Sequence, residues 1–139
     1  MKQRIVVADD DPTIVTLVSL RLEPNYEVVA AGSGDEAIEQ IRSHPPHAAI
    51  LDVQMPGLDG LAALEKIKSD PATAGVPVMM LTGERNPETV LHALSAGAAD
   101  YMVKPFDPDV LAERVARMIR IAQAAPPAPD AVSNSMTEI

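Results

Sequence analysis

The sequence predicts a doubly wound α/β fold, in which five parallel strands form one sheet between two layers of helices. Three observations lead to this prediction. Short apolar runs bounded by Gly, Pro and Asp recur along the chain, as in parallel strands that are buried on both faces. Segments with helical periodicity alternate with these runs. Several of those segments begin with a capping residue followed by proline, which is typical of a helix start.

Apolar runs at 5–8, 48–51, 78–81 and 102–103 mark four of the strands. A fifth strand fits between the first two expected helices. We therefore place the strands near residues 4–8, 27–31, 47–51, 77–81 and 99–103.

The helices are expected near residues 12–23, 35–43, 59–69, 87–97 and 108–122. Three begin with a capping side chain before proline: Asp11-Pro12, Asn86-Pro87 and Asp107-Pro108. Ser33 and Glu36 have the spacing of a capping box. The last helix shows one apolar stripe, while its three arginines, Arg114, Arg117 and Arg120, are interpreted as a solvated face.

The chain has 139 residues, which corresponds to one domain with a single substantial core. We assign residues 1–122 to this domain. From Gln123 to Ile139 the composition becomes rich in Pro and Ala and then polar, so this stretch is interpreted as a linker or disordered tail. Such a tail is compatible both with a stand-alone domain and with the front part of a longer protein.

The composition excludes several functions. The formal charge of −9 disfavours non-specific binding to nucleic acid or to anionic membranes, and only three aromatic residues are present to stack on bases. The absence of cysteine excludes disulfides and thiolate metal sites. No signal peptide or membrane-spanning segment is expected, so the sequence is interpreted as that of a cytoplasmic protein.

Polar residues follow or end four of the predicted strands: Asp9, Asp10, Asp52, Thr82 and Lys104. The carboxyl ends of parallel strands meet at one edge of the sheet, where ligands of such folds bind. Three carboxylates with few other ligands suit Mg²⁺ better than a fully caged Ca²⁺. One carboxylate could attack a phosphoryl donor, while an ammonium and a hydroxyl hold the phosphoryl oxygens. The pattern therefore indicates phosphoryl chemistry with a divalent metal.

Other polar residues have simpler interpretations. Asp11 and Asp107 are expected to cap helices, and Asp109 to complement a helix dipole. The three histidines, His44, His47 and His92, lack the spacing of a metal site and are expected in loops or on the surface.

Four segments together resemble the receiver domain of two-component response regulators. They are Val6-Val7-Ala8-Asp9-Asp10-Asp11-Pro12, Leu51-Asp52-Val53-Gln54-Met55-Pro56-Gly57-Leu58-Asp59-Gly60, Leu81-Thr82-Gly83 and Tyr101-Met102-Val103-Lys104-Pro105-Phe106. The resemblance covers residues 3–122 in the order and spacing of that family. It implies the strand order 2-1-3-4-5 of a flavodoxin-like three-layer sandwich, an order for which a member of this family is a standard example.

The resemblance also assigns roles. Asp52 would be the phosphoacceptor, and Thr82 and Lys104 would contact the phosphoryl group. Asp10, Asp52 and the backbone carbonyl of Gln54 would bind Mg²⁺ or Mn²⁺, with Asp9 acting largely through water. The Lys104–Pro105 bond is a candidate cis peptide.

The implied function is a switch rather than an enzyme, with intrinsic autophosphorylation and autodephosphorylation. Phosphorylation by a sensor histidine kinase or phosphotransfer protein would draw Thr82 toward the phosphoryl group and let Tyr101 move inward. The face formed by the fourth helix, fifth strand and fifth helix would then change its preference for an output protein, a fused output domain or a second copy. Gln54 and Glu84 flank the path of attacking water and are hypothesised to tune the phosphoryl lifetime. Gly83 stands where the family usually has Ala, which predicts a looser loop after Thr82.

Two alternatives remain at this point. Asp9, Asp11 and Thr13 fit the Asp-x-Asp-x-Thr motif of haloacid-dehalogenase-type phosphatases, with Asp9 as nucleophile. Against this, Pro12 starts a helix at once, no acidic pair follows Lys104 at a strand end, and Asp52 would have no role. The second alternative is a binding module with the same fold that is never phosphorylated.

Overall fold

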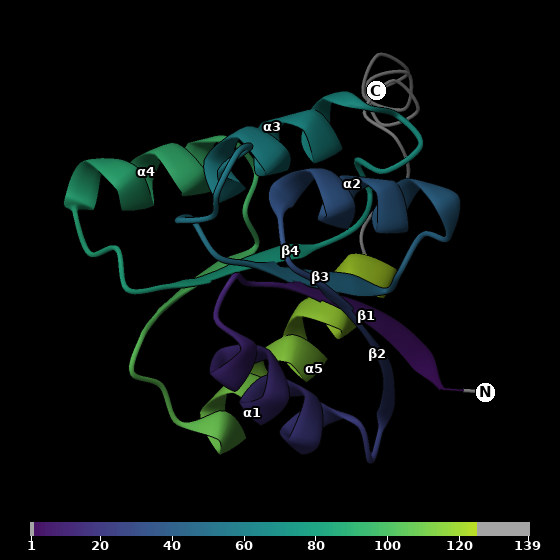
Figure 1. Cartoon of the computed structure of the whole chain (residues 1–139). Helices are drawn as coiled ribbons and strands as arrows, with labels where there is room; N and C mark the ends of the chain where they lie inside the picture. The colour runs from purple at the N-terminus through teal and green to yellow at the C-terminus, as the bar shows by residue number, and fades with distance from the viewer. Residues whose placement is uncertain (1, 125–139) are drawn as a thin grey trace, which may run out of the picture.

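The computed structural model describes residues 2–124, which form alternating strands and helices (Figure 1). The strands are β1 (Gln3–Ala8), β2 (Tyr26–Ala31), β3 (Ala48–Leu51), β4 (Val78–Thr82) and β5 (Asp100–Val103). The helices are α1 (Pro12–Leu22), α2 (Gly34–Ser43), α3 (Gly60–Ser69), α4 (Pro87–Ser95) and α5 (Pro108–Ala124). The predicted order of elements is confirmed.

All strand pairs are parallel, and the sheet has the order β2-β1-β3-β4-β5 that the resemblance implied. In the register of the central strands, Ala8 lies opposite Leu51, and Thr82 lies opposite Val103. Residues 9 and 52 therefore follow directly on paired positions, as do residues 83 and 104. This register decides which side chains meet at the carboxyl edge of the sheet.

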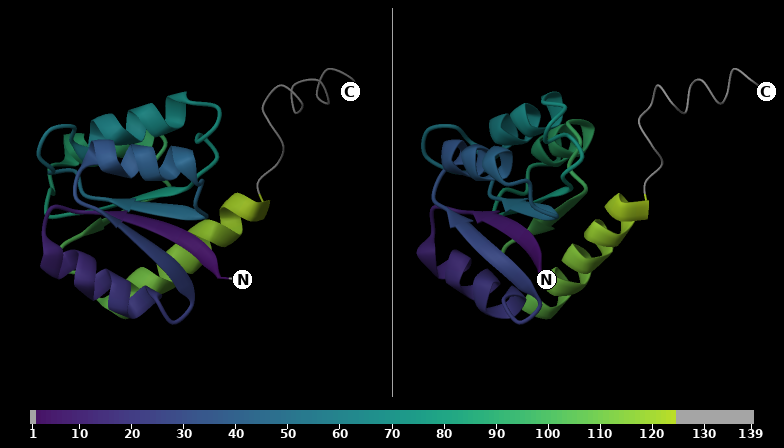
Figure 2. Two further views of the ribbon diagram at one scale, coloured as in Figure 1. Left: turned by 45° about the vertical axis from the view of Figure 1, so that its right-hand side comes forward. Right: turned by 90° about the vertical axis from the view of Figure 1, so that its right-hand side faces the viewer.

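Helices cover both faces of the sheet: α2, α3 and α4 lie on one side, and α1 and α5 on the other (Figures 1 and 2). Side chains alternate between these layers along each strand. In β1, Val6 packs in the core under α2 and α3, whereas Ile5 and Val7 pack against α1 and α5. The central strands are buried on both faces, as their continuous apolar runs predicted.

The helix starts agree with the predicted caps. The side chains of Asp11, Ser33 and Asn86 accept hydrogen bonds from the first turns of α1, α2 and α4. The Glu36 carboxylate accepts a hydrogen bond from the backbone N–H of Gly32, one residue before the expected partner in a capping box. Asp59, which the sequence pattern did not mark as a cap, accepts a hydrogen bond from Ala62 N at the start of α3.

The ends of α4 and α5 differ from the prediction. The α4 helix ends at Ser95 rather than at residue 97, because Gly97 adopts a positive φ of 106° that terminates the helical hydrogen bonds. The α5 helix continues to Ala124, two residues beyond the predicted boundary. The remainder of the predicted tail, residues 125–139, lies outside the described residues.

The arginine-rich face of α5 is exposed to solvent, as predicted, and two of its arginines also form ion pairs. The guanidinium groups of Arg114 and Arg117 lie 3.4 and 3.7 Å from the Asp100 carboxylate at the start of β5. Arg117 and Arg120 are exposed, and Arg114 is partly exposed.

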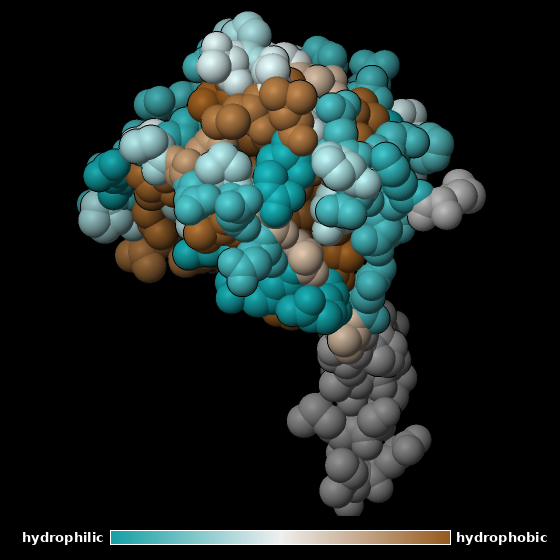
Figure 3. Space-filling view, turned by 90° about the horizontal axis from the view of Figure 1, so that it is seen from below, coloured by the Kyte–Doolittle hydropathy of each residue, from teal (hydrophilic) through white to brown (hydrophobic). Residues whose placement is uncertain are grey.

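The surface formed by α1 and α5 is mixed in polarity, with apolar areas between hydrophilic side chains (Figure 3). Among the large hydrophobic residues of this surface, Leu20 of α1 is the most exposed, at 67%. Within the described part of the chain, none of the helices combines the length and the apolar character needed to cross a membrane.

Candidate phosphoacceptor site

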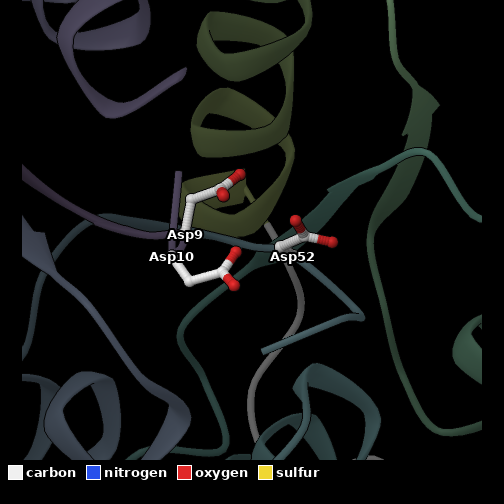
Figure 4. A group of neighbouring side chains, drawn as sticks. All are labelled: Asp9, Asp10 and Asp52. Carbon is white, nitrogen blue, oxygen red and sulfur yellow. The ribbon is translucent and has the colours of Figure 1, made fainter. Parts of the chain in front are cut away.

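The ends of β1 and β3 bring two buried carboxylates together (Figure 4). The backbone N–H of Asp52 donates to the carbonyl of Ala8 at 3.1 Å, so the sheet ladder continues one residue past β3. Asp9 and Asp52 are only 4% and 6% exposed. Two carboxylates in such a position repel each other unless a cation lies between them.

Lys104 supplies that cation. Its Nζ lies 2.7 Å from Asp9 Oδ2 and 2.9 Å from Asp52 Oδ2, and both contacts are hydrogen-bonded ion pairs. The position of Lys104 follows from the sheet, because its backbone N–H donates to the carbonyl of Thr82 at 2.8 Å. Three residues that are distant in the sequence therefore form one charged cluster.

Asp10 completes a group of three carboxylates that could hold a metal ion. One carboxylate oxygen from each of Asp9, Asp10 and Asp52 lies within 4.8 Å of the others. Asp10 is exposed, so the group opens to solvent on its side. An all-oxygen donor set with an open side fits Mg²⁺ or Mn²⁺, which retain water and bind phosphate oxygens.

Burial and charge shift two ionisable groups of the cluster. Burial raises the pKa of the Asp9 carboxyl above its ordinary value of 3.8, and this outweighs the hydrogen bonds from Lys104 and from Asp11 N–H. Burial alone would lower the pKa of the Lys104 ammonium, but its hydrogen bonds to Asp9 and Asp52 raise it above 10.5. Perturbed ionisation of this kind is common at functional sites.

Both oxygens of Asp52 have partners. Its Oδ2 accepts from Lys104, and its Oδ1 accepts from the backbone N–H of Gln54 at 3.0 Å. The side chain of Gln54 is exposed. The loop after β3 thus holds the Asp52 carboxylate in one orientation, with Gln54 beside it.

Thr82, Glu84 and Tyr101 form a second group next to the cluster. The Thr82 side chain is fully buried, and its Oγ1 accepts from the backbone N–H of Glu84 at 3.2 Å. The carbonyl of Glu84 accepts from the Tyr101 hydroxyl at 2.7 Å. Burial, together with the nearby charges of Glu84 and Asp52, raises the pKa of the Tyr101 phenol. Glu84 therefore connects the residue at the end of β4 with the aromatic ring of β5.

The loop after β5 contains the Lys104–Pro105 bond, which is cis in the structure. The carbonyl of Lys104 accepts a long hydrogen bond of 3.4 Å from the exposed Arg85 guanidinium. This contact joins the loops that follow β4 and β5. Sequence reasoning gave Arg85 no role, since a single exposed arginine carries no pattern.

Gly60 is a second position that sequence reasoning missed. A Cβ on this residue would overlap the backbone oxygen of Asp52, so only glycine allows α3 to begin there. The sequence does contain a pattern that could have indicated this position. Asp59 and Gly60 precede an apolar helical segment, and Asp59 caps that helix.

The residues with simpler interpretations lie outside the cluster. Asp11 accepts from Thr13 N–H, and Asp107 accepts from Asp109 N–H, as helix caps do. His44, His47 and His92 are all exposed, as expected, and His47 lies in the loop before β3, where its Nδ1 accepts from Arg4 N–H. Of the acidic groups that could hold a metal among residues 2–124, only the Asp9–Asp10–Asp52 group gathers three ligand atoms.

Comparison with known proteins identifies the family to which the sequence and fold are similar. The family model of the response regulator receiver domain matches residues 5–116. A crystal structure of a putative response regulator from Chloroflexus aurantiacus J-10-fl has 36% sequence identity and a TM-score of 0.82, covering 86% of this chain and 99% of that one. A CheY-like receiver domain protein from Methanospirillum hungatei JF-1 has 29% identity and a TM-score of 0.84, covering 89% and 98% of the two chains.

Two relatives are longer regulators. The DNA-binding response regulator MtrA of Mycolicibacterium smegmatis is 34% identical over 121 residues, which are 86% of this chain and 52% of MtrA. The alkaline phosphatase synthesis transcriptional regulatory protein PhoP of Bacillus subtilis is 33% identical over 137 residues, which are 98% of this chain and 56% of PhoP. The chain spans about half the length of these relatives.

Proposed function

The chain belongs to the response regulator receiver domain family of two-component systems, and from this membership we propose that Asp52 accepts a phosphoryl group from a sensor histidine kinase or phosphotransfer protein. The observation that carries the proposal is the cluster in which Lys104 bridges Asp9 and Asp52 while Asp10 opens to solvent. Reactive carboxylate, metal ligands and phosphoryl-binding ammonium thereby share one edge of the sheet.

In the proposed reaction, a carboxylate oxygen of Asp52 attacks the phosphorus of a phosphohistidine. The P–N bond breaks as the new P–O bond forms, and the released imidazole takes up a proton. Lys104 exchanges its contact with Asp52 for a phosphoryl oxygen, and the Thr82 hydroxyl contacts a second one. Hydrolysis later breaks the P–O bond and releases inorganic phosphate, with Gln54 and Glu84 beside the path of the attacking water. Substituting these two residues should therefore alter the phosphoryl lifetime.

The carboxylates of Asp9, Asp10 and Asp52 fit Mg²⁺ or Mn²⁺, and we expect the carbonyl of Gln54 to join them, with Asp9 acting largely through water. The ion would neutralise negative charge that accumulates between the donor phosphate and the carboxylates. A donor set made only of oxygens supports this choice of metal.

The proposed consequence of phosphorylation is a change at the face formed by α4, β5 and α5. Phosphorylation adds roughly 1.5 to 2 negative charges at Asp52. Thr82 moves toward the phosphoryl group, and the Thr82–Glu84–Tyr101 connection carries the change to β5. We propose that this face then binds an output protein, a fused output domain or a second copy of the chain. The expected setting is the cytoplasm.

The test is phosphorylation by acetyl phosphate with Mg²⁺, followed by intact-mass measurement. The wild type should gain one phosphate, Asp52→Asn should gain none, and Asp107→Asn serves as a matched control at the same edge. A phosphatase of the haloacid-dehalogenase type would instead turn over the donor and depend on Asp9, so Asp9→Asn distinguishes that alternative. Absence of a mass gain in every variant would support the module that is never phosphorylated.

A further inference from the structure

The net charge of the chain is concentrated at the carboxyl edge of the sheet. The loops that follow the strands, with the first three residues of each helix, contain two basic side chains, Arg85 and Lys104. The acidic side chains there are Asp9, Asp10, Asp11, Asp35, Glu36, Asp52, Asp59, Glu84, Glu88, Asp107 and Asp109. Since the whole chain has 20 acidic and 11 basic residues, this edge carries the full formal charge of −9, and the remainder is balanced.

Most of these carboxylates have no cationic partner. Asp9 and Asp52 contact Lys104, and Asp109 contacts Arg21 at 2.9 Å. No other acidic residue of this edge has a Lys, Arg or His nitrogen within 4.0 Å among residues 2–124, and we call these eight the acidic rim. The rim consists of Asp10, Asp11, Asp35, Glu36, Asp59, Glu84, Glu88 and Asp107.

Helix capping explains why acidic residues stand here, but it does not cancel their charge. Five helices begin at this edge, and each N-terminus contributes about +0.5 of an elementary charge. Their sum is a fraction of the rim charge. Of the seven acidic residues elsewhere in residues 2–124, three pair with arginines: Glu27 with Arg4, Asp70 with Arg42, and Asp100 with Arg114 and Arg117. The negative potential around Asp52 is therefore a local property of the molecule.

We propose that the acidic rim selects the phosphodonor of the Asp52 site by charge. This inference rests on the proposed function. Small phosphodonors are anions, so the rim repels them as they approach within the screening length of about 8 Å at physiological salt. A protein donor whose docking face is rich in Lys and Arg is attracted instead, and such steering raises association rates by factors of roughly 10 to 10³. The partner that this edge fits is thus a phosphohistidine surrounded by cationic side chains.

The first experiment uses acetyl phosphate at saturating Mg²⁺. Asp35→Asn/Glu88→Gln neutralises two exposed rim residues outside the reactive cluster, and Glu39→Gln/Glu113→Gln makes the same charge change on helical positions away from the edge. The initial rate of phosphorylation should rise severalfold with KCl for the wild type. At low salt the rim variant should react severalfold faster than the wild type, while the control variant matches it. Equal rates for rim and control variants would overturn the proposal.

The second experiment compares two synthetic phosphohistidine peptides of equal length, flanked by lysines or by glutamates. The lysine-flanked peptide should transfer its phosphoryl group about tenfold faster at low salt, and high salt and the rim variant should both reduce this ratio. Phosphorylation of Asp52 at equal rates from both peptides would refute the charge selection while leaving the acceptor role intact. No Asp52-dependent mass gain with any donor would refute the acceptor role, and the selection with it.

Discussion

The Tyr101 hydroxyl donates a hydrogen bond of 2.7 Å to the carbonyl oxygen of Glu84. The backbone N–H of the same Glu84 donates to the hydroxyl oxygen of Thr82. A displacement of Thr82 therefore strains or breaks its hydrogen bond to Glu84. Because Glu84 also accepts the hydrogen bond from Tyr101, that second hydrogen bond is affected as well. The contribution of the Tyr101–Glu84 hydrogen bond to the free energy of unfolding can be measured.

Tyr101→Phe removes the donor of this bond and leaves the ring. We expect the free energy of unfolding to fall by about 1 kcal/mol, the usual net contribution of one hydrogen bond. Urea denaturation measures the change. Tyr26→Phe is the matched control, because the hydroxyl of Tyr26 makes no hydrogen bond within residues 2–124. Equal stability changes in the two variants would contradict the prediction.

Asp9→Asn should stabilise the protein at neutral pH when divalent ions are removed with EDTA. Burial raises the pKa of Asp9 above 3.8, so the folded state binds this proton more tightly than the unfolded state. Stability from this group thus increases as the pH falls toward 3.8, and the advantage of the variant should shrink there. Chemical denaturation at about pH 7 and pH 4.5 tests both points.

Mg²⁺ provides the contrasting condition for the same variant. A metal that binds only the folded state stabilises it by mass action. The wild type should gain more from Mg²⁺ than Asp9→Asn does, since the variant lacks one carboxylate of the group. If Asp9→Asn were less stable than the wild type under EDTA, the prediction would be wrong. The hydrogen bonds to the Asp9 carboxylate would then outweigh the cost of burying it.

Gly60→Ala should disturb the Asp52 loop directly. The added Cβ would overlap the backbone oxygen of Asp52 and lie 2.9 Å from Val53 Cα, so the backbone must shift. We expect a loss of about 2 kcal/mol in unfolding free energy, within the range for overpacking. Phosphorylation of Asp52 by acetyl phosphate should also be slower. Unchanged stability and an unchanged phosphorylation rate would contradict this close approach.

Gly83→Ala is the contrasting substitution in the next loop. A Cβ at this position meets nothing within 4 Å, and the residue does not have a positive φ. Alanine should therefore stabilise the protein by about 0.4–1 kcal/mol through the lower entropy of the unfolded chain. Thermal unfolding compares the variants. Destabilisation would mean that the loop after Thr82 requires the freedom of glycine.

Lys68, which lies away from the site, should make the stability of the protein depend on pH. Its ammonium donates to the carbonyls of Ala74 and Val76, and burial lowers its pKa below 10.5. The unfolded state then binds more protons in the range just below 10.5, so the contribution of Lys68 to stability rises with pH there. The wild type should gain stability relative to Lys68→Met as the pH rises toward 10.5. Lys66→Met is the matched control on the same helix, and a constant difference for Lys68→Met would refute the shift.

Local physical chemistry made most of the fold predictable. Buried parallel strands require continuous apolar runs, and helix starts require caps, so the five strands and five helices could be placed within a few residues. The strand order came from the family resemblance. The helix ends were less predictable, because a chain reversal such as that at Gly97 depends on backbone conformation.

The sequence by itself determined that carboxylates, a hydroxyl and an ammonium follow the strands, because a parallel sheet carries all its strand ends to one edge. Only the tertiary structure decided how they contact one another. The strand register places Lys104 between Asp9 and Asp52, while the conformations of the loops turn the Glu84 carbonyl toward Tyr101 and bring Gly60 against the backbone of Asp52. The contacts of Lys104 join residues 95 and 52 positions apart in the chain, and contact distances of a few ångströms depend on packing that no local pattern encodes.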